Sequence, residues 1–441
     1  MRYRRGVNAL ERRFGLAASG TTVRRELLGG LTTFMTMAYI IVVNPAILSG
    51  AGMDFGAVMT ATCLAAGIAT WVMGLAANYP IAMAPAMGEN VFFVGVVTGM
   101  GVSWRIALAA VFLSGVAFVV LNLFHVRELL IEAIPPSLKL AIASGIGLFI
   151  AMIGLKNAGL VGAGMRLGDL GHPAVSLACL GLALTVGLLA RRVAGAILIG
   201  MAATTAAALA AGMIRWQGLV AAPPSLAPTF LQLDLRGALA PAMLPIVLLF
   251  LFMAVFDAVG TLVGIGEQAG FLRDGKLPRA GRALTADASG TVVGSLLGTS
   301  TVTAYIESAT GVEAGARTGL ANLVTGALFF LALWLSPVAS MIGGGIPIEG
   351  GSLNPMTAPA LIVVGSLMAR SLARIDWADI TEGFPAFLTV AGIPFFGSIA
   401  DGISFGFIAY PLLKVLAGRP REATWLVYVL GVVLALRYVV L

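Results

Sequence analysis

The sequence predicts an all-α polytopic membrane protein, and three observations support this fold class. Hydrophobic residues make up 59% of the 441 residues against 11% charged, and the mean hydropathy is +0.99. A soluble core cannot bury so much apolar surface. The apolar residues form many runs near the ~20 residues that a helix needs to cross a bilayer. Lys and Arg collect in the short segments between those runs, as topology signals do.

The first half of the chain begins with a basic tail, residues 1–28, which we expect in the cytoplasm. No short apolar region with a cleavage site follows its arginines, so we expect no removable signal peptide. Seven apolar runs then predict the first repeat, residues 29–212. Its spans lie near residues 29–49, 57–77, 81–99, 104–124, 137–155, 173–190 and 194–212.

A polar segment with three prolines, residues 213–240, separates the halves and predicts an external linker. A second repeat follows over residues 241–418. Its seven predicted spans lie near residues 241–265, 284–299, 302–315, 318–341, 355–370, 383–398 and 401–418. The C-terminal segment, residues 419–441, is apolar from residue 424 onward and is either a fifteenth crossing or an interfacial segment.

The distribution of Lys and Arg tests this assignment, because short cytoplasmic loops carry an excess of positive charge. With the N-terminus inside, 21 of the 27 Lys and Arg residues fall on cytoplasmic segments. The external segments hold Arg105, Lys156, Arg166, Arg215 and Arg236. Two halves of seven spans each must then have opposite orientations. The sequence therefore predicts 14 spans as two inverted repeats, the layout of secondary transporters.

Transporters of that layout bind their cargo near the midplane, where one interrupted helix from each half exposes backbone groups. Two prolines and a glycine interrupt the predicted third span just before Glu89 and Asn90. The predicted tenth span opens with a β-like run of Thr and Val and then reaches Glu307 and Ser308. We therefore expect a short extended segment leading into a half-helix in each repeat, with the two half-helices facing each other.

An acid also lies inside the apolar eighth span: Asp257, with Phe256 beside it and Thr261 one turn further along. A charge at the centre of a span costs ~2.5–3.5 kcal/mol, so carboxylates retained at that depth indicate function. Structural ion pairs are the alternative, but every Lys and Arg falls in a loop or at a span end. For Asp287 in the ninth span, structural and functional roles are equally open. We predict substrate binding by Asp257, Glu307, Asn90, Glu89, Ser308, Phe256 and Thr261, and proton coupling by Asp257 and Glu307.

Other classes of function have little support in the sequence. Cys63 and Cys179 lie in separate apolar runs, and neither histidine has a partner at metal-ligand spacing, so we expect no metal and no cofactor. The absence of a paired nucleophile and base argues against an enzyme. The net charge of +7 is spread over short loops, which argues against nucleic acid as a partner.

Four ordered motifs resemble the AzgA-type purine permeases of the nucleobase cation symporter 2 group. They are GLTTFMTMAYIIVVNPAIL from Gly30 to Leu48, APAMGENVFF in the third span, FDAVGTLVG around Asp257, and the stretch from Gly275 to Leu320. The last stretch contains GKLPR and ALTADASGTVVGSLLGTSTVTAYIESATGVEAGARTGL. The resemblance covers nearly the whole chain.

This resemblance implies a core domain of spans one to four and eight to eleven, and a gate domain of the remaining spans. It implies that Asp257 and Glu307 match the paired acids that hold the base, with Asn90 contributing from the third span. The group's usual third-span motif has glycine where Ala86 stands and often an apolar residue at the position of Glu89.

The expected activity is import of hypoxanthine, guanine or adenine across the cytoplasmic membrane by proton symport, with alternating access of core against gate. Carboxylates and backbone groups can bind the ring N–H groups and edges of a neutral purine. Burial favours the protonated form of a carboxylic acid, which can link proton binding to substrate occupancy. The expected partners are thus a purine base and the lipid bilayer, and a homodimer is compatible with the sequence.

Two alternatives share this architecture: an anion exchanger, and a Na⁺-coupled transporter of nucleobases, including pyrimidines or xanthine. An anion exchanger should carry a cation at the midplane, whereas this centre is acidic. A channel would need a continuous polar pore, whereas the polar residues cluster at one depth.

Overall fold

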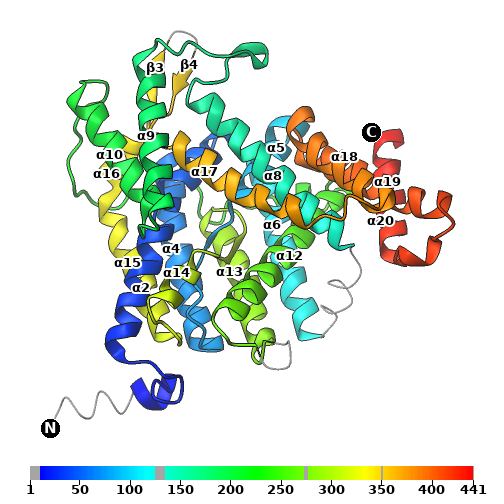
Figure 1. The fold of residues 1–441 in the computed structure, drawn as a ribbon, viewed down its shortest axis with the longest axis horizontal. Coiled ribbons are helices and arrows are strands. Elements are labelled where there is room, and N and C mark those ends of the chain that lie inside the picture. The colour runs from blue at the N-terminus through cyan, green and yellow to red at the C-terminus, as the bar shows by residue number, and fades with distance from the viewer. Residues whose placement is uncertain (1–9, 125–134, 273–276, 349–350, 441) are drawn as a thin grey trace.

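Helices dominate the computed structural model, which describes residues 10–124, 135–272, 277–348 and 351–440 (Figure 1). The first nine residues of the predicted tail lie outside these ranges, as do the predicted cytoplasmic residues Arg127, Arg273 and Lys276. The helices of the first half are α2 (Val23–Met37), α3 (Ile40–Leu48), α4 (Phe55–Val72), α5 (Met87–Met100), α6 (Trp104–Leu123), α8 (Pro136–Asn157), α9 (Pro173–Ala190) and α10 (Ala196–Ala210).

The second half follows the short α11 (Leu235–Ala238). Its helices are α12 (Leu244–Gln268), α13 (Ala280–Leu297), α14 (Ser308–Glu313), α15 (Leu320–Ala332), α16 (Ser336–Gly343), α17 (Ala358–Met368), α18 (Ile380–Phe396), α19 (Ile399–Leu416) and α20 (Trp425–Val440). Four short strands complete the fold: β1 (Met83–Pro85), β2 (Val302–Ala304), β3 (Ile346–Ile348) and β4 (Gly351–Leu353).

Seven helical stretches of the described residues are long and apolar enough to cross a membrane. They are Val23–Ala51, Phe55–Ala77, Trp104–Leu123, Pro136–Asn157, Pro173–Ala190, Pro241–Gln268 and Leu320–Gly343. Shorter apolar helices include Met87–Met100, which lies between two of these stretches, and Ile380–Phe396, which follows the last of them. The prediction of a helical polytopic membrane protein is therefore confirmed.

The first helix begins earlier than the predicted span at residue 29. Thr22 caps it, because its side chain accepts a hydrogen bond from the backbone N–H of Arg25. Glu26 is fully buried in its first turn, where it accepts hydrogen bonds from the backbone N–H groups of Thr318 and Ala321, each at 3.2 Å. Hydropathy alone started the span too late, because Glu26 lies inside the helix, where its carboxylate satisfies backbone groups at the start of α15.

Two helices are interrupted at matching places in the two halves. Strand β1 precedes α5 and strand β2 precedes α14, and the two strands pair antiparallel with Ala84 opposite Thr303. The backbone N–H of Ala86 donates to the carbonyl of Thr301 at 2.8 Å, and that of Tyr305 donates to the carbonyl of Ala82 at 3.0 Å. The predicted extended segments leading into half-helices are thus present, and they satisfy each other's backbone groups inside the protein.

The helices pack in two groups. In one group α2 and α4 contact α15, and α6 and α4 contact α13; in the other α8 contacts α17 and α18, and α9 contacts α10. Figure 1 shows the second group reaching out to α18, α19 and α20, far from the N-terminal α2. The interrupted helices lie with the first group, and α5 touches α8 across the boundary.

The segment between the halves is bound more firmly than the prediction of an external linker suggests. Thr229 is fully buried, and its hydroxyl donates to the carbonyl of Leu297 at 3.2 Å. The hydroxyl of Thr60 donates to the carbonyl of Pro224 at 2.9 Å. These contacts fix the segment to α4 and α13, although many of its side chains are exposed.

Candidate functional site

Three carboxylic acids meet where the paired strands give way to half-helices. Asp257 lies in the middle of α12, Glu307 directly precedes α14, and Glu89 lies in the first turn of α5. All three lie within electrostatic range of Tyr305, and Asp257 is a charge neighbour of both glutamates. The structure therefore brings together the acids that the sequence selected from three distant spans.

Glu307 is held by a tyrosine that the sequence interpretation did not select. The hydroxyl of Tyr39, in the break between α2 and α3, donates to Oε1 of Glu307 at 2.7 Å. Tyr39 is almost completely buried, and Glu307 is half-buried. This bond fixes one carboxylate oxygen and leaves the other available to a ligand. The phenol is the only polar side-chain group in the run from Met37 to Val43, a signal that could have found it.

The start of α5 supplies both an acceptor and a donor. Glu89 and Asn90 are buried, and within the described residues neither Oε1 of Glu89 nor Nδ2 of Asn90 has a hydrogen-bond partner. The hydroxyl of Ser300 donates to Oδ1 of Asn90, which orients the amide. Buried polar groups are rarely left unpaired, so two of them in consecutive residues indicate the place of a polar ligand.

Asp257 differs from its neighbours because it is exposed, although it lies inside an apolar helix. Gly260 is exposed one turn further along α12, and a Cβ added there would meet no atom within 4 Å. A carboxylate facing lipid would be expensive, so we infer that this face of α12 borders a water-accessible opening. Glu267, at the end of α12 that leads to Arg279, is exposed as well.

The other three predicted binding residues surround the acids in different ways. Ser308 is buried, and its hydroxyl oxygen accepts the backbone N–H of Ala82 at 2.9 Å, so it fixes the start of β1. Thr261 is buried on α12. Phe256 is half-buried, and the ammonium of Lys139 lies 4.8 Å from the centre of its ring. Their contacts with a ligand stay predictions.

The strands themselves are held by polar side chains from neighbouring helices. Oδ1 of Asp287 accepts the backbone N–H of Ala304 at 2.8 Å and the hydroxyl of Thr303 at 3.0 Å. The hydroxyl of Thr291 donates to the carbonyl of Val302 at 3.0 Å, and that of Thr70 to the carbonyl of Met83 at 3.1 Å. These bonds give Asp287 a structural role, one of the two roles that the sequence left open for it.

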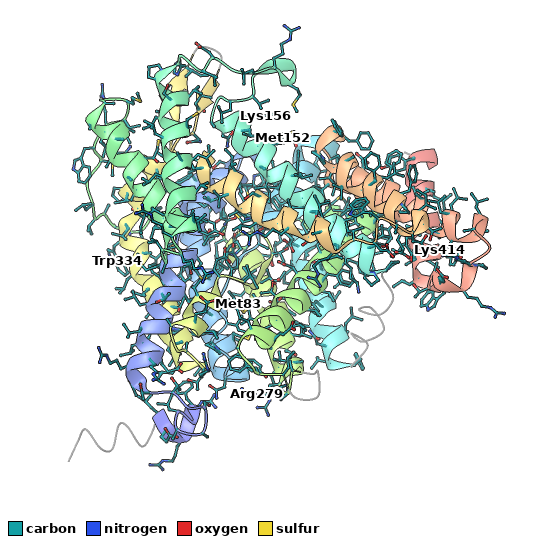
Figure 2. The ribbon with its side chains drawn as sticks, viewed as in Figure 1. Met83, Met152, Lys156, Arg279, Trp334 and Lys414 are labelled. Carbon is teal, nitrogen blue, oxygen red and sulfur yellow. The ribbon has the colours of Figure 1, made fainter. Side chains whose placement is uncertain are left out.

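Lys139 lies in the first turn of α8 and Lys414 in the last turn of α19, so both are at span ends as predicted, but a cation at a span end can still be buried. Lys414 is buried in α19 and forms ion pairs with Glu382 and Glu422, each at 2.7 Å. The ammonium of Lys139 lies against the ring of Phe256. Sequence position could not show that neighbouring helices would cover Lys414. Figure 2 shows Lys414 at the edge of the molecule, far from Met83 of β1 in the middle, so its ion pairs leave the acid cluster untouched.

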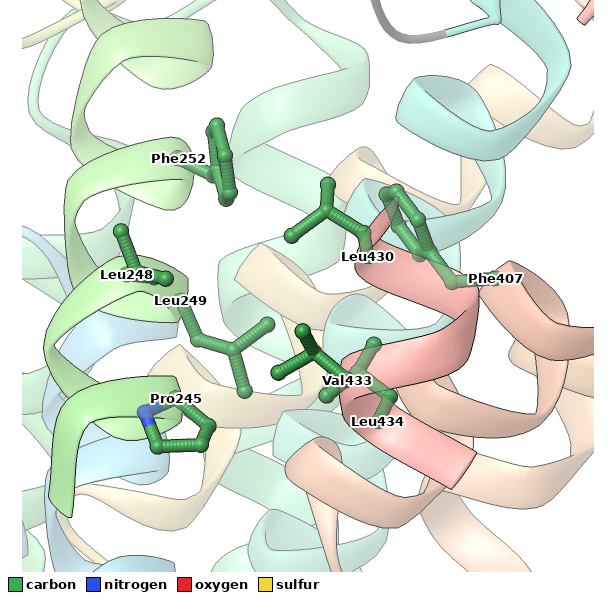
Figure 3. A pocket seen from close by; sticks show the side chains of 8 residues that line it. All are labelled: Pro245, Leu248, Leu249, Phe252, Phe407, Leu430, Val433 and Leu434. Atoms are coloured by element: carbon green, nitrogen blue, oxygen red, sulfur yellow. The ribbon is translucent and has the colours of Figure 1, made fainter. Parts of the chain in front are cut away.

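A small cavity between α12, α19 and α20 lies outside this cluster (Figure 3). Its volume is about 10 Å³, and its lining is apolar, including Phe252, Phe407 and Leu430. A space of that size and composition cannot hold a polar ligand. The acid cluster is therefore the stronger candidate site.

Comparisons with known proteins show the family of this chain. The model of the family described as the permease family Xan_ur_permease matches residues 24–400. The Methanocaldococcus jannaschii protein MJ0326 is 53% identical over 98% of both chains. The guanine/hypoxanthine permease PbuG of Bacillus subtilis is 45% identical over 96% of this chain and 98% of its own. The adenine permease AdeP of Escherichia coli is 42% identical over 98% of this chain and 97% of its own.

A solved structure gives the fold. The transmembrane domain of the cyanobacterial bicarbonate transporter BicA superposes with a TM-score of 0.63, covering 87% of this chain and 97% of its own. The two sequences are only 15% identical, so this likeness shows the fold alone.

Proposed function

This chain belongs to the permease family, and from that premise we propose that it imports purine nucleobases across the cytoplasmic membrane by proton symport. In this proposal the N-terminus is cytoplasmic, and fourteen spans form two inverted repeats. The core comprises α2 to α6 and α12 to α15, and the gate comprises α8 to α10 and α17 to α19. The relatives PbuG and AdeP, which are described as purine permeases, support the choice of cargo.

The observation that carries the proposal is the meeting of Asp257, Glu307, Glu89 and Asn90 beside the paired strands. Carboxylates accept hydrogen bonds from the ring N–H and exocyclic amino groups of a neutral base, and the Asn90 amide can donate to a ring nitrogen or carbonyl. Hydrogen bonds to ionised acceptors are about twice as strong as neutral ones, which favours this site as the place of recognition.

The same carboxylates supply a place for the coupling proton. The negative charge of Asp257 repels those of Glu89 and Glu307, and a proton bound to Asp257 removes both repulsions. Asp257 is the best candidate for this proton because it is the exposed member of the cluster. Asp257 and Glu307 remain our proposed coupling pair.

The test is uptake of labelled hypoxanthine, guanine, adenine, uracil, bicarbonate and sulfate by a bacterial host that lacks its own purine carriers. We expect purine uptake that stops when a protonophore collapses the proton gradient. Uptake that survives the protonophore but needs sodium would replace the proton by Na⁺ as coupling ion. Transport of sulfate or bicarbonate without purines would make the chain an anion exchanger.

A further inference from the structure

A second cavity lies between the two groups of helices, away from the acids. Its volume is about 260 Å³, and α3 and α5 form one wall while α8 and the start of α17 form the other. Val91 and Val94 of α5 line it, one turn or less beyond Asn90. The cavity thus follows α5 from the residue after Asn90 toward the end of the helix, and none of the three acids lines it.

The cavity lies toward the external end of the molecule in the proposed topology. It reaches Thr98 near the end of α5 and Asn157 at the end of α8. Figure 2 shows Lys156 at one end of the molecule and Arg279 at the opposite end, with Met83 between them. A base that enters from outside between core and gate would pass this cavity before it reaches Asp257.

The two walls differ in chemistry. The wall from α3 and α5 is aliphatic, with Val43 and Val94 among its residues, and Phe149 of α8 adds an aromatic ring. The opposite wall carries the amides of Asn157 and Asn354 and the hydroxyl of Thr357. Within the described ranges none of these three side chains has a hydrogen-bond partner, and Oδ1 of Asn354 is buried without one. The cavity therefore offers unused donors and acceptors opposite an apolar surface.

We propose that this cavity is a second, external binding site for the same uncharged purine base, a proposal that rests on the proposed function. A flat heterocycle can lie on the aliphatic wall and Phe149 while its polar edge meets Asn157, Asn354 and Thr357. The cavity is smaller than the ~300 Å³ at which pockets for drug-sized ligands begin, which suits a single small ring system.

The chemistry of this site predicts weaker and less selective binding than at the acids. Amides and a hydroxyl both donate and accept, so they match any purine edge with neutral hydrogen bonds. The carboxylates at the inner site form charge-assisted bonds and accept only. The external site thus captures a base without needing the proton. The inner site then selects the base and couples its transport to the proton.

Equilibrium binding of labelled hypoxanthine to the purified full-length protein in lipid nanodiscs tests this proposal. We expect two bases per chain, one tight and one weak. Thr357→Val should weaken the weak phase about threefold to tenfold, because one neutral hydrogen bond is lost, and should leave the tight phase unchanged. Glu307→Gln should do the reverse. The unchanged tight phase in Thr357→Val also shows that this variant is folded.

Thr98→Val is the matched control. Thr98 lines the same cavity, but its hydroxyl already donates to the carbonyl of Val94 at 2.8 Å, so its loss should leave both phases as in the original chain. Binding of only one base per chain would overturn the external site, and so would equal weak-phase affinities in the two threonine variants. Neither result would contradict the proposed purine transport. Absence of any hypoxanthine binding would instead reject the proposed function and the second site with it.

Discussion

The hydrogen bond from Tyr39 to Glu307 determines which carboxylate oxygen of this acid can contact a ligand. With Oε1 engaged by the phenol at 2.7 Å, the other oxygen of Glu307 is the one free to meet a ligand. Asp257 has no such restraint within the described residues, and it borders the water-accessible opening. The two acids are therefore suited to different tasks, with Glu307 holding the base and Asp257 exchanging the proton.

Glu307→Gln and Asp257→Asn separate these tasks. Glu307→Gln keeps size and one acceptor oxygen but makes a charge-assisted hydrogen bond neutral, so purine affinity should fall about tenfold. Asp257→Asn should leave binding measurable but much less dependent on pH, and active uptake should fail. Purine affinity measured against pH for the purified variants checks both. Two variants that bind as tightly as the original chain, with its pH dependence, would make the acids structural.

Tyr39→Phe tests the positioning role of the phenol. The variant removes one hydroxyl from a buried ring and leaves the carboxyl of Glu307 in place. We expect purine affinity to fall about twofold to tenfold, the effect of one lost hydrogen bond that orients the acceptor. In the Glu307→Gln background the same change should have a smaller effect, because the two residues act through one contact. Equal effects in both backgrounds would place Tyr39 outside the binding machinery.

Much of the candidate site was predictable from single residues. Asp257, Glu307 and Glu89 are acids in apolar runs, and the cost of burying charge identifies such positions. Tyr39, Ser300 and Lys139 were not found, because a tyrosine, a serine or a lysine near a span is common and gains meaning only from the contact it makes. Their partners are up to 268 residues away in sequence, as for Tyr39 and Glu307.

At the level of elements, α8 of the first half packs closely against α17 of the second. A Cβ added at Gly365 of α17 would lie 2.3 Å from the carbonyl oxygen of Gly147 in α8. The two backbones therefore meet without side chains between them, as small residues allow in membrane helices. Movement of these helices relative to the core should preserve this contact.

Gly365→Ala should destabilise the protein by about 1–3 kcal/mol through overpacking. The expected result is a lower temperature at which the purified protein loses its monodisperse peak in size-exclusion chromatography after heating. Gly187→Ala on the exposed face of α9 is the control, since a Cβ there meets nothing within 4 Å. Equal thermal stability of the two variants would show that α8 and α17 are more loosely packed than the structure indicates.

Elements were predictable to different degrees. Long apolar helices such as α12 and α6 follow from composition and length, and the interruption before α5 follows from its prolines. The lengths and register of β1 and β2 do not, since three residues of strand gain stability only from a partner in the other half. The burial of Lys414 likewise depends on how α19 packs beside α18 and its acid Glu382.

For the whole molecule, the orientation of the two halves is the first matter to test. A reporter fused within residues 275–280 should indicate the cytoplasm, because this segment is one of those rich in Lys and Arg, which are typical of cytoplasmic loops. A reporter fused within residues 222–228 should indicate the outside. Two reporters that indicate the same side of the membrane would exclude inverted repeats.

Access to the acid cluster is a second property of the whole molecule. Gly260→Cys in a Cys179→Ser background places a thiol on the exposed face of α12, while the native Cys63 is fully buried. A membrane-impermeant thiol reagent should label it from the cytoplasmic side in inverted vesicles, and purine should slow the labelling. The Cys179→Ser chain alone should stay unlabelled. Labelling only from the external side would reverse the direction of the opening.

The pairing of β1 with β2 also sets an order for biosynthesis. Strand β1 leaves the ribosome more than 200 residues before its partner, which is roughly 10 to 40 s at ordinary rates of translation. During that interval its backbone groups lack the hydrogen bonds that the finished protein gives them. Until the second half is made, other groups must pair with the backbone of β1, because unpaired backbone groups are costly inside a bilayer. Quality control in the membrane has that interval in which to recognise a chain whose second half never comes.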